Sequence, residues 1–147
     1  MFLSREARLV SAITLLVVPT IMYGGWTLLG ILTHGSPSPG IHLDETQWAL
    51  WRAGHAHAGV WTILSLLLQI LLDSARLSHA AKWLARLCAP LAAVLLSAGF
   101  FGVAVSLSLR WLIYLGVLSM LIALLLTAIG LLRDSRSGAP AARELAP

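Results

Sequence analysis

Long apolar stretches alternate with short polar segments along this chain of 147 residues. Each of four stretches approaches the ~20 consecutive apolar residues with which a helix crosses ~30 Å of hydrocarbon. The pattern therefore predicts an all-α fold, an integral membrane four-helix bundle in which residues 1–132 form one domain and residues 133–147 form a disordered tail. The expected spans are roughly residues 9–32, 50–72, 83–105 and 111–132.

Composition agrees with this pattern, because 59% of the residues are hydrophobic and 11% are charged. The positive-inside rule then predicts that the N and C termini are both cytoplasmic and that the chain is a multi-pass protein of the cytoplasmic (inner) membrane. Arg52 and Arg110 fall on the opposite side. The excess of basic residues thus reflects the orientation of the chain in the membrane, and no nucleic-acid partner is expected. The basic residues at the N-terminus, in the second connection and in the tail are Arg5, Arg8, Arg76, Lys82, Arg86, Arg133, Arg136 and Arg143.

Two histidines, His55 and His57, lie just inside the outer end of the second apolar stretch. Ionisable side chains at membrane depth are costly and mark functional sites. Residues two apart on a helix point about 200° from one another, so one ion cannot be held by both imidazoles unless the helix is broken there. Small neighbours such as Gly54 and Gly59 leave a low surface for a flat cofactor or another helix.

Haem is the ligand that best fits one imidazole per face, because iron takes an axial histidine and the porphyrin needs flat apolar space. A zinc or copper ion would need further donors, and the spacing of the outer-loop candidates matches no dedicated metal motif. In a third alternative both imidazoles are neutral and bond to neighbouring helices, and the protein is structural and has no cofactor. The outer-loop candidates are His34, His42, Asp44 and Glu45.

Most polar and aromatic side chains are expected at one level, in the outer half of the bundle. The inner half is apolar apart from Gln69, Ser119 and Thr127. Any pocket should therefore open in the outer half. The residues at that level are Tyr23, Trp26, His55, His57, Trp61, Ser97 to Phe101, Trp111 and Tyr114.

The residues Trp51, Arg52-Ala53 and His57-Ala58-Gly59 resemble the start of the second span in the styrene oxide isomerase family of small four-helix membrane enzymes. Gly24-Gly25-Trp26 and Gly35-Ser36-Pro37 are similar to that family too. The resemblance implies haem b (iron) between the subunits of a homotrimer. Ferric haem would act there as a Lewis acid that converts a small lipophilic epoxide to a carbonyl compound by a 1,2-hydride shift.

This resemblance implies a metal ligand and a set of catalytic residues. His57 would be the axial iron ligand, and His55 would be a second ligand or a polar group of the distal pocket. The family's Gly-Phe-Tyr stands here as Gly99-Phe100-Phe101, so Tyr114 or Tyr23 would replace the missing tyrosine. The family's asparagine two turns beyond its ligand is Ile63, or Trp61 if His55 binds the iron.

The remaining cofactor contacts are expected around the histidines. Arg52 would pair with a haem propionate. Gly54, Gly59 and Trp61 would lie against the porphyrin. The His-Ala-His segment also resembles part of haem-copper oxidase subunit I, which implies the alternative of an electron-transfer or oxidase-associated subunit with six-coordinate iron.

Overall fold

The computed structural model describes residues 3–34 and 43–137, and these ranges contain helices and no strand. All four long helices have the length and apolar composition of membrane spans. The all-α fold with four such helices is therefore confirmed. The helices are α1 (Arg5–His34), α2 (Glu45–Ser74), α3 (His79–Val103) and α4 (Arg110–Ser137), with a 3₁₀ turn, η1 (Leu107–Leu109), before α4.

The helices extend beyond the apolar stretches at several ends. α2 begins at Glu45 because Asp44 and Gln47 form a capping box, in which each side chain accepts a hydrogen bond from the other residue's backbone N–H. α4 continues to Ser137, so residues 133–137 are helical rather than part of a tail. Residues 138–147 lie outside the described ranges. Hydropathy locates the hydrocarbon-crossing part of a helix, whereas caps decide where its backbone hydrogen bonds end.

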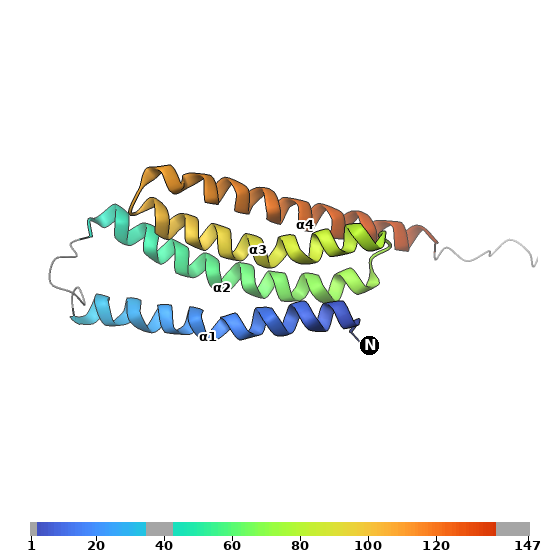
Figure 1. The fold of residues 1–147 in the computed structure, drawn as a ribbon, viewed down its shortest axis with the longest axis horizontal. Helices are drawn as coiled ribbons and strands as arrows, with labels where there is room; N and C mark the ends of the chain where they lie inside the picture. Colours follow the sequence, from blue (N-terminus) through green and yellow to red (C-terminus); the bar gives the residue numbers. More distant parts are fainter. Residues whose placement is uncertain (1–2, 35–42, 138–147) are drawn as a thin grey trace, which may run out of the picture.

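The helices do not form a symmetric four-helix bundle. α3 packs closely against both α2 and α4, whereas α1 lies along α2, touches α3 at few points and makes no contact with α4 within the described ranges (Figure 1). Glycines allow the close α3–α4 approach: a Cβ on Gly99 would lie 2.8 Å from the Ile113 backbone nitrogen, and one on Gly116 would lie 2.9 Å from that of Leu96. The fold is a three-helix unit with α1 on its flank.

A buried polar cluster joins the first three helices at the end of the molecule where α1 begins. Arg86 is 3% exposed, and its Nη1 donates to the Gln69 backbone oxygen at 3.1 Å and to Oε1 at 3.2 Å. Its Nη2 donates to the Asp73 carboxylate and to Ser4 Oγ. Ser4 in turn donates to Asp73 through its backbone N–H and its hydroxyl. We call these four residues the Arg86 cluster.

The cluster corrects two expectations. Arg86 lies within α3 and not in a solvated connection, and the half of the bundle expected to be apolar contains an ion pair between buried Arg86 and partly buried Asp73. Pro90 accounts for part of this arrangement: it has no N–H to bond the Arg86 carbonyl one turn earlier. Gln69 Nε2 donates to that carbonyl instead, at 3.1 Å. A side-chain hydrogen bond from α2 thus replaces the backbone hydrogen bond that is missing in α3.

Candidate functional site

His55 projects from α2 toward α1, at the end of the molecule opposite the Arg86 cluster. A Cβ on Gly25 would lie 2.9 Å from His55 Nε2, and a Cβ on Gly24 would lie 3.8 Å from Nδ1. The paired glycines therefore let the α1 backbone approach the imidazole. Because Nε2 lies against α1, no space remains beside it for a metal ion and a porphyrin in this arrangement.

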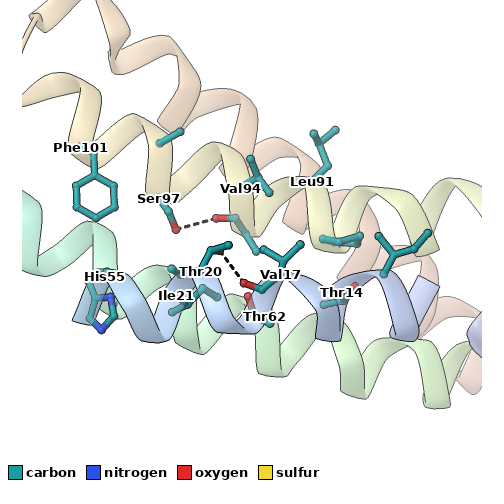
Figure 2. A pocket seen from close by; sticks show the side chains of 16 residues that line it. Thr14, Val17, Thr20, Ile21, His55, Thr62, Leu91, Val94, Ser97 and Phe101 are labelled. Carbon is teal, nitrogen blue, oxygen red and sulfur yellow. Dashed lines mark hydrogen bonds between the residues drawn. The ribbon is translucent and has the colours of Figure 1, made fainter. Parts of the chain in front are cut away.

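His55 also stands at one end of an apolar groove, which Figure 2 shows from close by. α2 forms its floor, and α1 and α3 form its walls. The volume is about 500 Å³. The lining consists of Ile13, Thr14, Val17, Thr20, Ile21 and Gly24 of α1, His55, Ala58 and Thr62 of α2, and Pro90, Leu91, Ala93, Val94, Ser97, Ala98 and Phe101 of α3.

Most hydroxyl groups in the groove are bonded within their own helices. Thr14 donates to the Val10 carbonyl, Thr20 to that of Val17 and Ser97 to that of Ala93, at 2.7–2.8 Å. Thr62 differs, because its hydroxyl has no hydrogen-bond partner among the described residues although the side chain is 7% exposed. The groove is thus an apolar slot with two free polar groups, the Thr62 hydroxyl and the His55 imidazole.

His57 lies on a different face of α2, and this confirms the helical phase expected for the two histidines. Its Nδ1–H donates to the Ala53 carbonyl at 2.7 Å, and its ring lies 4.5 Å from that of Phe100, centroid to centroid. Trp61 packs nearby, with ring centroids 6.3 Å apart. Within the described ranges Nε2 has no partner. A ring nitrogen fixed by a backbone carbonyl, with the other nitrogen free, is the usual state of a metal-ligating histidine.

The other predicted cofactor contacts on α2 differ in their surroundings. Gly54 is covered by Phe101, whose ring a Cβ there would approach to 3.1 Å, so this glycine offers no surface to a flat cofactor in the described arrangement. Gly59 has no atom within 4 Å of its Cβ position. Arg52 is exposed on α2.

The structure does not bring the two tyrosines to the histidines. Tyr23 is 66% exposed and packs edge-on against Trp26 of α1, whereas Tyr114 is 55% exposed and packs against Trp111 of α4. Neither lines the groove. Within the described ranges of a single chain the two tyrosines thus lie away from the groove, because equal depth in a bilayer does not place two side chains on the same side of the bundle.

Several buried polar groups near the site were not anticipated. Thr62 follows His55 by seven residues, which places both on one face of α2, so the helical period could have identified it. The indole nitrogens of Trp51 and Trp61 are buried and have no hydrogen-bond partner among the described residues. No pattern in the sequence indicates that an indole will lack an acceptor, because that depends on which helix covers it.

The metal-ion alternative gains no support from the described residues. In that part of the chain, no three His, Cys, Asp or Glu side chains are close enough together to hold a metal ion. His42 and the side chain of His34 lie outside it. Comparisons of the chain with protein-family models, with curated proteins and with solved structures find no match.

Proposed function

We propose that this chain is a haem b protein of the cytoplasmic membrane and that it isomerises a small lipophilic epoxide. The observation that carries the proposal is the state of His57, whose Nδ1–H is bonded to a backbone carbonyl while Nε2 has no partner among the described residues. Together with the resemblance of Arg52-Ala53 and His57-Ala58-Gly59 to the styrene oxide isomerase family, this geometry supports His57 as the axial ligand.

The surroundings of His57 fit a haem better than those of His55 do. Phe100 supports the His57 ring from one side, and the buried Trp61 indole N–H has no acceptor. His55 Nε2, in contrast, lies against Gly25. Because the imidazoles lie on different faces of α2, one iron cannot be bound by both in a single chain. The electron-transfer alternative with six-coordinate iron would therefore need its second ligand from a neighbouring copy or from a loop histidine.

Ferric haem held by His57 would supply a Lewis acid for the epoxide oxygen. The residues of the chain would position this group and keep water away. The Ala53 carbonyl fixes the tautomer that leaves Nε2 as the ligand, and Phe100 and Trp61 provide an apolar surface beside it. Exclusion of water matters because water would convert the opening epoxide to a diol.

The position of His57 bears on the oligomer. Its face of α2 is opposite the groove, so a haem on His57 and a ligand in the groove of one subunit would lie on two sides of the helix. The resemblance to the styrene oxide isomerase family implies a homotrimer with haem between its subunits, and an outward-facing His57 is compatible with a pocket that a neighbouring copy completes. Tyr23 and Tyr114, being exposed, are available to such a neighbour, and Arg52 is available to a propionate.

The test is turnover by the haem-loaded protein in lipid nanodiscs. Aryl and alkyl epoxides are added, and the products are separated by gas chromatography. The proposal predicts an aldehyde or ketone without added reductant, and no product from His57→Ala. A haem-loaded protein that leaves every such epoxide unchanged would contradict the isomerase assignment, and a purified protein without a Soret band after haem addition would contradict the cofactor as well.

A further inference from the structure

The groove has the dimensions of a single hydrocarbon chain. α1 lines it from Ile13 to Gly24 and α3 from Pro90 to Phe101, so at ~1.5 Å rise per residue it is about 16 Å long. A volume of about 500 Å³ over this length corresponds to a mean cross-section of about 30 Å². That section matches one extended or methyl-branched chain.

The opening is built into the fold, because α1 is attached to α2 at both ends of the groove. Ser4 bonds to Asp73 at one end, and Gly24 and Gly25 meet His55 at the other. Between these attachments α1 stands away from α3. The space persists there because the residues of the floor and of the far wall include small ones, namely Ala58, Ala93, Ser97 and Ala98.

Both free polar groups of the groove belong to its α2 floor. Thr62 and His55 lie about two turns apart on the same face of α2, and Ala58 lies between them. The Thr62 hydroxyl opens into the groove and has no hydrogen-bond partner among the described residues, so a purely hydrocarbon ligand would leave it unpaired. An oxygen atom above Ala58 could accept a hydrogen bond from the Thr62 hydroxyl or from the His55 ring.

The lack of charged side chains in the lining limits the class of ligand further. The lining contains no Asp, Glu, Lys or Arg side chain among the described residues, so nothing would offset the desolvation of a phosphate group. We infer that the groove binds a single-chain lipophile with one hydrogen-bond-accepting oxygen, such as a long-chain ketone, aldehyde or epoxide. The oxygen lies between Thr62 and His55, and the chain runs toward Ile13 and Leu91. This site is separate from the haem site proposed on His57.

Photolabelling of the full chain in lipid nanodiscs tests the inference. The probe is a long-chain methyl ketone with a diazirine near the far end of its chain, and the comparison probe has the same chain and diazirine without the oxygen. After irradiation, the labelled residues are mapped by mass spectrometry. We expect the ketone to label α1 between Ile13 and Val17 and α3 between Pro90 and Val94, and to do so several-fold more strongly than the hydrocarbon.

Two pairs of variants separate the hydroxyl from the space around it. Thr62→Val keeps the shape and removes the free hydroxyl, and should weaken ketone labelling roughly three- to tenfold. Thr27→Val is its matched control, because that hydroxyl is already bonded to the Tyr23 carbonyl and does not line the groove, and it should leave labelling unchanged. Ala98→Trp should abolish labelling by filling the groove from an exposed position, and Leu118→Trp, on an exposed site of α4, should not.

The inference is overturned if the oxygen-free chain labels the groove as strongly as the ketone, since ordinary bilayer lipid would then fill it. It is also overturned if Thr62→Val and Thr27→Val behave alike, or if Ala98→Trp is labelled normally. Circular dichroism of each variant establishes that the helices are retained. Because the readout does not involve haem, His57→Ala should be labelled like the unmodified chain. The haem proposal and the groove proposal can therefore fail independently.

Discussion

The two ends of the bundle differ in whether their polar groups are hydrogen-bonded to one another. In the Arg86 cluster, Ser4, Asp73 and Gln69 all bond to Arg86, and the side chains satisfy one another. Near the histidines, Thr62 and Nε2 of His57 have no partner among the described residues. Polar groups that satisfy one another hold helices together, whereas accessible polar groups without a partner can bond to a ligand. We therefore expect the Arg86 cluster to stabilise the fold and the end with the histidines to bind a ligand.

The largest effect is expected from Arg86→Leu, which leaves the partly buried Asp73 carboxylate without its cation. Removal of one partner of a fully buried pair costs about 3–5 kcal/mol in the free energy of unfolding, and we expect the lower end of that range because Asp73 is partly exposed. Unfolding in mixed detergent micelles measures it, and Arg8→Leu, at an exposed position of α1, is the control. A variant as stable as the unmodified chain would show that the Arg86 cluster does not hold α1 to the hairpin.

Gln69→Leu should cost less, about 1–3 kcal/mol, because it leaves the Arg86 carbonyl without a donor and removes one acceptor from the guanidinium. The substitution Pro90→Ala restores a backbone N–H opposite that carbonyl. In the double variant we therefore expect roughly 1 kcal/mol of the loss to be recovered. If the two substitutions are strictly additive in the same unfolding assay, Gln69 does not replace the hydrogen bond that Pro90 removes.

Gly25→Ala should have a smaller effect, roughly 1–2 kcal/mol, because the new methyl group meets the His55 ring at 2.9 Å and forces it or α1 to move. Gly30→Ala in the same helix is the matched control, since no atom lies within 4 Å of its Cβ position, and it should be neutral or slightly stabilising. Equal stabilities of the two variants would contradict the close contact between α1 and His55. Such a result would also reopen His55 as a metal ligand.

The sequence predicts the helices well and their lateral arrangement poorly. Apolar length identifies four candidate spans, and the helical period places His55 and His57 on different faces, as the structure does. Depth along a span, however, says nothing about which side of the bundle a residue faces. The sequence places Tyr23 and Tyr114 at the level of the histidines, but they lie on α1 and α4, which do not touch within the described ranges.

The Arg86 cluster could not be predicted for a related reason. Arg86 and Asp73 are on different helices, and their pairing depends on how the α2–α3 hairpin closes and on the carbonyl that Pro90 leaves free. A basic residue near the end of an apolar stretch normally indicates a solvated connection. The burial of this one follows from tertiary packing, which no local pattern contains.

The most direct test of His57 as an iron ligand is a haem titration of the purified apoprotein, followed by the Soret band. His57→Gly should lose stoichiometric haem binding and regain it when imidazole fills the vacated space, whereas His55→Gly should bind haem like the unmodified chain. Retained haem binding by His57→Gly in the absence of imidazole, with loss of binding by His55→Gly, would contradict the assignment of His57 as the ligand.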